Sequence, residues 1–401
     1  MATRLISVAQ ARELVLDAIR PLAHEQVQLG AALGRVLASD VQAAADVPPF
    51  PCSAMDGYAI VAGDAGRRLA IVAESRAGAP AKRELGDGEA IRISTGAAVP
   101  TGATAVIPQE NVELWDSSIE TAAAVAPGQN VRGAGEDMRA QTTVLRAGTR
   151  LGAVELGAAV AAGVGAVSAA RMPRVAVLCT GDELRAPGAT LGPGEIHNSN
   201  APMLTGLAAG AGAATGEAQR LPDDPAATQA GIGAALESSD VVIISGGVSV
   251  GPHDHVKPAL AALGVGEVFW SVALQPGKPT WFGTRGEDRL VFGLPGNPVS
   301  TVVTFSLFVA PALAALQGLR PARALEAEAA LGVEVRRDPR REQAIRVRLK
   351  RGGTAPVATP NGAQGSHILT SLLGADALAM IPPGEGTLAA GTTVALEPLT
   401  R

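Results

Sequence analysis

A glycine-rich loop, residues 245–254, is the first segment whose composition suggests chemistry, and it follows an apolar run. Glycines such as Gly246 and Gly247 permit a tight turn and a close approach of the backbone, so the loop's N–H groups could cradle a phosphate. The loop is not a Walker A motif, because no Lys-Ser/Thr pair follows the glycines. The alternative is an ordinary turn in which Asp254 caps the following helix.

Acidic side chains follow two other apolar segments. Asp182 and Glu183 come directly after one of them, and carboxylates at a strand end could hold a magnesium ion or face a polar ligand. Asp223 and Asp224 form a similar pair, but Pro225 favours the start of a helix there, so either acid could be its cap. Solvated turn acids remain the simpler alternative for both pairs.

Two loops later in the chain carry residues suited to anions. The segment 275–279 holds Lys278 in a rigid turn between prolines, an arrangement that suits an oxyanion or a phosphate. In the segment 293–300, Asn297 stands where the next helix is expected to begin, and helix N-termini attract anions. A plain helix cap explains Asn297 equally well.

Three glycine- or proline-broken segments in the first third of the chain also carry polar residues, although none of them decides function by itself. They are residues 48–59 with Asp56, 94–97 with Thr95, and 130–137 with Asp137.

Several kinds of site are disfavoured. The five histidines form no metal pattern, since His253 and His255 lack a third ligand of known spacing. There is no Gly-x-Ser-x-Gly elbow for a serine nucleophile. Cys52 and Cys179 are too far apart in sequence for a metal motif, and two cysteines predict a reducing compartment rather than a disulfide framework.

The elements that must position these loops follow from apolar periodicity. From residue 172 to 320 strands alternate with helices, which predicts a parallel α/β domain with its site at the carboxyl ends of the strands. We expect helices at 7–19, from 153 onward, at 201–210, 226–236, 256–263 and 297–316, and strands at 70–73, 90–94, 144–149, 174–179, 240–244, 290–293 and 344–349.

Length and composition limit the class of protein. A chain of 401 residues suits two to four domains, and 47% hydrophobic residues suffice for sizeable cores. The net charge of -5 is mild and the basic residues are spread, so no nucleic-acid partner is expected. The N-terminus has no apolar signal core, and residues 302–316 are too short for a span and contain Pro311. We therefore expect a cytoplasmic protein with no membrane partner.

Taken together, the loops resemble those of the MoeA family, which includes the E domain of gephyrin. The segments that carry the resemblance run in the family's order from Pro48 to Leu378: PPFPCSAMDGYA, ISTGAAVP, NVRGAGEDM, TGDEL, SGGVSVGPHD, QPGKP, GLPGNPVS and QGSHILTSLLGADAL. The resemblance implies a multidomain α/β fold. Its parts are an elongated linker domain (1–45 and 140–171), a β insertion domain (46–139), a MogA-like α/β domain with a parallel-type sheet (172–320) and a C-terminal β domain (321–401).

The resemblance also implies roles for individual residues. The expected catalytic residues are Asp56, Thr95, Asp137, Glu183, Asp254, Lys278 and one of the Asp223–Asp224 pair, of which we select Asp224. The expected molybdate ligands are Lys278, Arg346 and Ser366, and the expected contacts to the pterin or nucleotide are Gly246, Gly247, Ser249 and Asn297. A magnesium ion would be held by Asp254 and Glu183.

The chain departs from the family pattern in three places. Gln275 stands where many relatives carry a lysine, so one possible molybdate contact becomes neutral. Pro51-Cys52 replaces an Asp-Asn pair, and Gln343-Ala344 replaces a Glu-Phe pair ahead of Arg346.

The implied reaction converts adenylated molybdopterin and molybdate into molybdenum cofactor and AMP. The implied assembly is a homodimer, with a MogA-like adenylyltransferase as a possible partner. Two rivals are a scaffold protein that has lost catalysis and a lone MogA-like adenylyltransferase. Retained acids and Lys278 disfavour the first, and the additional β domains disfavour the second. Molybdate and tungstate, equal in charge and nearly equal in size, are not distinguished.

Overall fold

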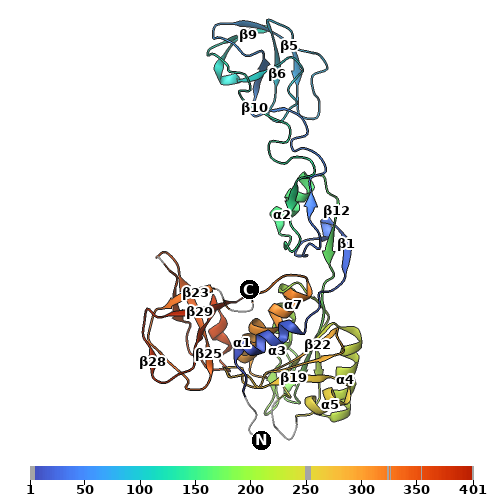
Figure 1. The fold of residues 1–401 in the computed structure, drawn as a ribbon, viewed down its shortest axis with the longest axis vertical. Coiled ribbons are helices and arrows are strands. Elements are labelled where there is room, and N and C mark those ends of the chain that lie inside the picture. Colours follow the sequence, from blue (N-terminus) through green and yellow to red (C-terminus); the bar gives the residue numbers. More distant parts are fainter. Residues whose placement is uncertain (1–4, 249–253, 323–324, 326, 354, 400–401) are drawn as a thin grey trace. The chain divides into compact units, whose positions relative to one another are not determined.

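The computed structural model describes residues 5–248, 254–322, 325, 327–353 and 355–399, and it has a multidomain α/β fold. The chain divides into two compact units. The first contains Met1–Glu25 and Ala170–Arg401, and the second contains Gln26–Ala169. Figure 1 traces the elements of both units along the chain.

The centre of the first unit is a seven-stranded sheet in which five strands pair in parallel and two further strands are added through antiparallel pairs. The parallel strands match the expected α/β pattern, whereas the sequence pattern does not predict the antiparallel pair, so the sheet is mixed. The order is β16 (Ala214–Thr215), β13 (Arg174–Thr180), β18 (Val241–Ser245), β22 (Arg289–Leu294), β21 (Trp281–Arg285) and β19 (Gly266–Trp270), with β17 (Gln219–Leu221) also paired with β13.

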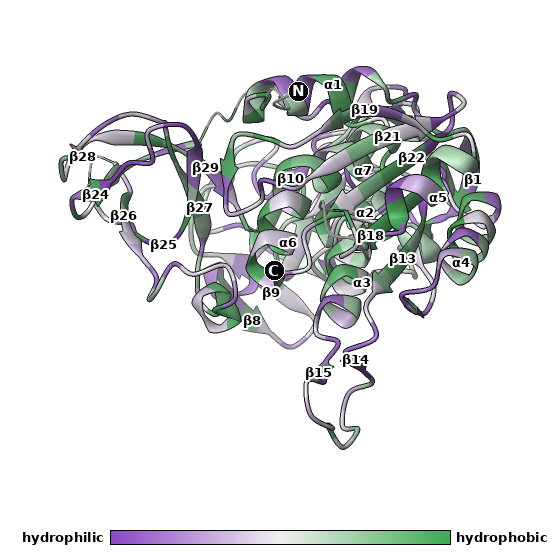
Figure 2. Ribbon diagram, turned by 90° about the horizontal axis from the view of Figure 1, so that it is seen from below, coloured by the Kyte–Doolittle hydropathy of each residue, from purple (hydrophilic) through white to green (hydrophobic). Residues whose placement is uncertain are grey.

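Helices cover both faces of this sheet and form two apolar cores with it. The central strands are strongly hydrophobic, as their colour in Figure 2 shows. One face carries α1 (Val8–Asp17), α3 (Asn200–Gly210), α6 (Pro298–Thr304) and α7 (Ala310–Leu316), and the other carries α4 (Pro225–Ser238) and α5 (Val256–Ala262).

The N-terminal helix α1 belongs to the first unit. Ser7 caps it, as expected, and a capping box with Gln10 completes the N-terminus. Its apolar face, which includes Val8, Ala11 and Val15, packs into the core of the α/β sheet. Residues up to Glu25, which we expected in the linker domain (1–45), group with the first unit.

The helix expected at 297–316 is interrupted by a π-helical turn, Phe305–Val309, between α6 and α7. Pro311 has no N–H, so it cannot donate the usual helical bond to the carbonyl of Leu307, four residues earlier. The guanidinium of Arg12 donates to that carbonyl at 3.3 Å and also pairs with Glu397 at 3.1 Å. Arg12 thus connects α1, the π turn and the C-terminal strand.

The stretch Pro298–Leu316 is long and apolar enough, by length and composition alone, to cross a membrane. However, 83% of it is buried inside the structure. A core helix passes the same test, so the stretch is weak evidence for a membrane span.

The C-terminal part of the first unit is a five-stranded closed barrel, because its first and last strands pair with each other as well as with their neighbours. Strand β20 (Leu274–Gln275) extends it by pairing with β25, and β24 (Val335–Arg336) pairs with β28 (Thr387–Leu388). The barrel strands are β25 (Glu342–Lys350), β26 (Val357–Pro360), β23 (Ala327–Leu331), β29 (Thr393–Pro398) and β27 (Ala377–Ile381).

The second unit contains a six-stranded sheet with an apolar cluster on each side, plus a small core around α2 (Ala153–Ala161). The sheet order is β7 (Ala105–Pro108), β4 (Gly57–Ile60), β6 (Glu89–Ile93), β5 (Arg68–Ser75), β9 (Ser118–Thr121) and β8 (Val112–Trp115). The remaining strands pair as β3 (Cys52–Ser53) with β10 (Val131–Arg132), β2 (Val41–Gln42) with β11 (Thr143–Leu145), and β1 (His24–Gln28) with β12 (Ala166–Ala170).

Candidate active site

Three parallel strands of the first unit end at one edge of the sheet and carry loops that form a pocket. The register aligns Cys179 with Ser245 and Ser245 with Leu294 at the carboxyl ends of β13, β18 and β22. This edge is where open α/β sheets bind ligands. The pocket has a volume of about 530 Å³, and we call it the acidic pocket because Glu183, Asp223 and Asp254 line it.

The two glycines after β18 are required by the backbone. Gly246 has φ +91° and Gly247 has φ +65°, the left-handed region that side chains disfavour. A Cβ on either residue would also lie within 3.0 Å of the Thr180 hydroxyl. The sequence-based prediction of a tight glycine turn is confirmed, and both residues line the acidic pocket.

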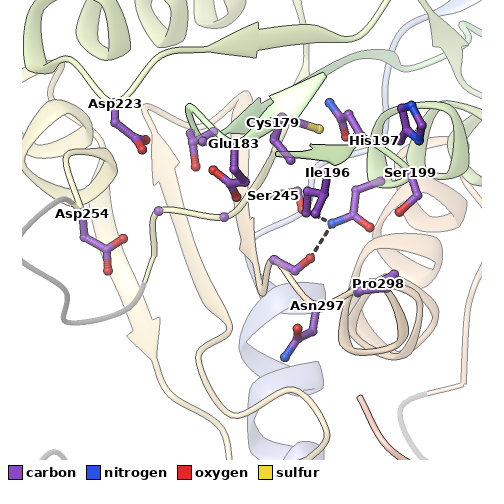
Figure 3. Close-up of a pocket in the computed structure, with 18 residues that line it drawn as sticks. Cys179, Glu183, Ile196, His197, Ser199, Asp223, Ser245, Asp254, Asn297 and Pro298 are labelled. Carbon is purple, nitrogen blue, oxygen red and sulfur yellow. Dashed lines mark hydrogen bonds between the residues drawn. The ribbon is translucent and has the colours of Figure 1, made fainter. Parts of the chain in front are cut away.

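The three carboxylates come from three different loops and gather on one side of the acidic pocket (Figure 3). Glu183 lies over the backbone of Gly181, where an added Cβ would meet its carboxylate oxygen at 2.3 Å. Asp223 accepts the N–H of Asp182 at 3.3 Å, so the two acidic loops are tied together. The N-cap residue of α5 is His255 rather than Asp254, and the His255 side chain makes no capping bond.

The adjacent Asp224 has a different environment. Its carboxylate accepts the N–H of Ala227 at 2.7 Å and caps α4. It is not among the residues that line the acidic pocket, whereas Asp223 is. From the sequence we selected Asp224. The structure instead favours Asp223 as the acid that faces a ligand.

The donor set of the acidic pocket suits a hard divalent cation. Its described lining contains three carboxylates and no lysine or arginine, so without a bound cation the acidic side chains there would repel a phosphate. The described residues contain no cluster of three or more His, Cys, Asp or Glu side chains that could hold a metal. Magnesium does not require one, since it commonly binds one or two carboxylates together with water and phosphate oxygens.

Asn200, at the start of α3, is a pocket residue that the sequence did not reveal. Its side-chain amide donates to the Ser245 hydroxyl at 2.8 Å and to the Gly296 carbonyl at 2.7 Å. Asn200 is 9% exposed, and these bonds lock together two of the loops that form the acidic pocket. The partners are 45 and 96 residues away in sequence, so no local pattern indicates them.

A second pocket of about 390 Å³ lies where the loop before β21 meets the C-terminal barrel, and we call it the basic pocket. It brings together Lys278, Arg346 and Ser366, the three residues expected to bind molybdate, and it adds Arg341. Gln275, Asn297 and Ser300 also line it.

Lys278 is presented by a rigid turn, as predicted from its sequence. Gly277 has φ +126°, and a Cβ there would lie 2.8 Å from both Leu274 and Thr304. The Lys278 carbonyl accepts the N–H groups of Val272 and Thr280 at 3.0 and 2.9 Å. The backbone is thereby fixed while the Lys278 side chain is exposed.

Arg346 is not presented in the same way, because it is 1% exposed. Its guanidinium donates to the Ser371 hydroxyl at 3.1 Å and to the carbonyls of Ala363 and Gly365 at 3.3 and 3.2 Å. Burial lowers the pKa of Arg346 to about 10, which leaves it protonated at neutral pH. Its observed contacts hold the loop that carries Ser366.

The two pockets meet at Asn297, which lines both of them. Although Asn297 is the N-cap residue of α6, its side chain makes no capping bond. Its amide instead donates to the Ser366 hydroxyl at 3.1 Å. The plain-cap alternative for Asn297 is therefore wrong, and the residue connects the acidic and basic pockets.

The comparisons with known proteins cover the whole arrangement of domains. Residues 6–163 match the model of the MoeA N-terminal region (domain I and II), residues 176–315 that of a probable molybdopterin binding domain, and residues 328–399 that of the MoeA C-terminal region (domain IV). A molybdopterin molybdenumtransferase of Haemophilus influenzae is 35% identical, and the match covers 98% of each chain. The chain belongs to the MoeA family.

Two further relatives agree. Molybdopterin molybdenumtransferase 2 of Mycobacterium tuberculosis is 36% identical, with 98% of this chain and 100% of the relative covered. The crystal structure of the molybdopterin biosynthesis MoeA protein of Pyrococcus horikoshii superposes with a TM-score of 0.80 at 33% identity, covering 98% of this chain and 99% of that one. The predicted membership and the assignment as an enzyme of molybdenum cofactor biosynthesis are confirmed, and the lone adenylyltransferase is excluded.

The expected MoeA site residues of the second unit fall into two places. Asp56 accepts hydrogen bonds from the Thr95 N–H at 2.7 Å and the Thr95 hydroxyl at 3.1 Å, so these two residues are in contact. Asp137 lines a separate surface pocket with Glu136 and Arg139. Within the described part of the chain, no hydrogen bond joins Asp137 to Asp56 or Thr95. Ser249, expected to contact the pterin or nucleotide, lies outside the described residues.

Proposed function

We propose that this MoeA-family enzyme inserts molybdate into adenylated molybdopterin and releases molybdenum cofactor and AMP. The observation that carries the proposal is the pair of pockets of opposite character that share Asn297. The reaction needs one site for a phosphate-linked nucleotide and another, close by, for a small dianion. Two adjoining pockets on one rigid scaffold would supply the proximity that the transfer requires.

The acidic pocket is proposed to hold the pyrophosphate link between the pterin and AMP. The Gly246 N–H already donates to the Leu294 carbonyl at 3.1 Å. The Gly247 N–H would approach a phosphate oxygen, and the absence of side chains at both glycines permits this close approach. Asp254 and Glu183, with Asp223 beside them, would hold a magnesium ion. When bound, the ion would neutralise charge that develops on the phosphate oxygens as the link breaks.

The basic pocket is proposed to bind molybdate. Lys278 would contribute charge, and the Ser366 hydroxyl a hydrogen bond, to the oxygens of the dianion. The buried Arg346 would support this site by fixing residues 363–366, since its observed donors are used within the protein. Tungstate has the same charge and nearly the same size, so both oxyanions belong in any binding assay.

The test is AMP release from adenylated molybdopterin, with and without molybdate and magnesium. Asp254→Ala should abolish magnesium-dependent release, while its melting temperature stays near that of the wild type, because even the loss of a helix cap costs only about 1 kcal/mol. Asp64→Ala is a matched control, since Asp64 lies in the second unit outside both pockets. Near-normal AMP release by folded Asp254→Ala would contradict the assignment, and a wild type without AMP release would favour the scaffold alternative.

We further propose that the enzyme works as a homodimer with shared sites. The resemblance implies that Asp56, Thr95 and Asp137 of one subunit face the acidic pocket of the other. Support comes from α2, where Val154 and Val160 are 79% and 61% exposed, a large apolar exposure for one short helix. A second copy of the chain would cover this face.

A MogA-like adenylyltransferase, expected from the resemblance, remains the proposed supplier of the adenylated substrate. We also retain the proposal that the enzyme acts in the cytoplasm. Handover of substrate would be tested by mixing the two enzymes with molybdopterin, ATP and molybdate. The turnover rate would be measured with each enzyme in turn at the lower concentration. A rate that does not depend on which of the two enzymes is limiting would argue against direct transfer.

A further inference from the structure

Among the residues expected to bind molybdate, the basic pocket offers fewer accessible positive charges than a dianion has negative charges. Gln275 lines the pocket and carries no charge. Arg346 is almost completely buried, and three oxygens of the protein accept hydrogen bonds from its guanidinium. A dianion that entered the pocket would therefore find a single expected cation, Lys278, with an accessible charged end.

Arg341 is the additional cation in the lining of the basic pocket, and its side chain is 34% exposed. Its guanidinium is oriented by Asp338, whose Oδ2 accepts from Nε at 3.2 Å and from one terminal nitrogen at 2.8 Å. Among the described residues, nothing accepts a hydrogen bond from the other terminal nitrogen. One edge of the planar guanidinium is thus fixed by Asp338, while the other terminal nitrogen can donate to a ligand.

The surrounding turn is itself fixed next to Gln275. The Oδ1 of Asp338 accepts the N–H groups of Arg340 and Arg341 at 2.8 and 2.9 Å, which closes the turn. The Asp338 N–H donates to the side chain of Gln343 at 2.9 Å, and Gln343 is the cross-strand partner of Gln275 in the β20–β25 pair. The pairing of these strands therefore brings the Arg341 turn close to Gln275.

We infer that Arg341 binds the oxyanion in the basic pocket and supplies the second positive charge that Gln275 does not. The inference rests on the proposed molybdate site, which it deepens by naming a further binding residue. Lys278 and Arg341 would approach the dianion from two segments, the turn before β21 and the turn before β25. Two cations match the two negative charges of the ligand, and each would donate charge-assisted hydrogen bonds.

The test is direct binding of sodium molybdate to the full-length protein by isothermal titration calorimetry, without any pterin. Arg341→Gln should raise the Kd by about tenfold or more, the range for losing a hydrogen bond to a charged group. Arg340→Gln is the matched control, because Arg340 is the adjacent arginine, is exposed and does not line the pocket. The melting temperature of each variant reports whether the turn still folds.

A double variant that moves the positive charge from position 341 to position 275 makes the test specific. Adding Gln275→Lys to Arg341→Gln should recover most of the lost affinity, since a lysine at 275 restores a second cation to the pocket. Equal molybdate affinity for the wild type, Arg341→Gln and Arg340→Gln would overturn the inference. A wild type that binds no molybdate, or a Lys278→Ala variant that binds molybdate as tightly as the wild type, would instead overturn the proposed molybdate site as a whole.

Discussion

Asp223 and Asp224 are neighbours in the chain with separate physical roles. The carboxylate of Asp224 is used by the first turn of α4, whereas Asp223 lines the acidic pocket beside Glu183. A side chain that caps a helix stabilises the fold, and one that faces a ligand acts mainly on binding or turnover. Substitutions at these two positions should therefore separate stability from activity.

We expect Asp224→Ala to lower the free energy of unfolding by about 1 kcal/mol, the usual cost of losing an N-cap, with AMP release largely retained. Asp223→Ala should do the reverse, with near-normal stability and reduced AMP release. Urea denaturation and the AMP assay, run on both variants, measure the two effects. The opposite pattern would return the functional role to Asp224.

The two cysteines provide a second expectation at this scale. Cys52 and Cys179 are both buried, and burial raises the pKa of the Cys179 thiol, which disfavours a reactive thiolate. The substrate would bring its own dithiolene sulfurs. A Cys52→Ala/Cys179→Ala variant should retain AMP release, although Cys179 borders the acidic pocket. Lost turnover in a folded double variant would reveal a thiol function.

At the scale of elements, strong periodicity and caps predicted most helices and the three central parallel strands. The short parallel strands β16 and β17 were not predicted, and the helix expected from residue 153 ends at Ala161. The expected helix at 226–236 is observed as Pro225–Ser238, and the expected strand at 174–179 as Arg174–Thr180. The antiparallel strands β19 and β21 were missed, because a mixed run such as Trp281–Arg285 has no clear alternation. The pocket residues Asn200 and Arg341 were missed because their roles depend on contacts between distant segments.

The π turn before Pro311 gives a prediction for one element. Replacing Arg12 by Met would remove its hydrogen bond to the Leu307 carbonyl and leave Glu397 without the cation that pairs with it. We expect the free energy of unfolding to fall by about 2–4 kcal/mol, the range for stranding buried polar groups. Arg20→Met is the control, because Arg20 is exposed and bonds only to nearby carbonyls of its own segment. Equal stability of the two variants would refute this role.

At the scale of the whole molecule, Asp240 links folding to pH. Burial alone would raise the pKa of Asp240, but hydrogen bonds from Arg171 and Arg174 outweigh it and lower the pKa from 3.8 to about 2. A carboxyl group with a depressed folded-state pKa stabilises the fold above its unfolded pKa. This contribution, about 2 kcal/mol, is lost as the pH falls from about 4 towards 2.

Asp240→Asn should therefore lower the free energy of unfolding at pH 7 by at least that amount and reduce the loss of stability between pH 4 and pH 2. Urea denaturation of the wild type and the variant at pH 7, 4 and 3 measures both effects. Parallel stability curves across this range would show that another carboxylate controls the acid response. Asp288→Asn is a suitable control, since the Asp288 side chain is 73% exposed in its ion pair.

The proposed shared sites give a prediction for the assembly. Asp56→Ala and Asp254→Ala should each be inactive, but subunit exchange should partly restore AMP release. In the mixed dimer one site would carry both substitutions and the other neither. Size-exclusion chromatography with light scattering would establish the dimer and the exchange. A monomeric protein, or exchanged mixtures that stay inactive, would contradict the proposal.

The hydrogen bond from Asn297 to Ser366 has a thermodynamic consequence. A hydroxyl has one proton, so when Ser366 accepts from Asn297, its own proton is available to a ligand in the basic pocket. A ligand in the acidic pocket that accepts a hydrogen bond from the Asn297 amide would remove the bond to Ser366. The hydrogen bonding of the Ser366 hydroxyl in the basic pocket would then change. The affinities of the two pockets would then be linked, and linkage is reciprocal. Whatever factor the nucleotide applies to the Kd of molybdate, molybdate must apply to the Kd of the nucleotide.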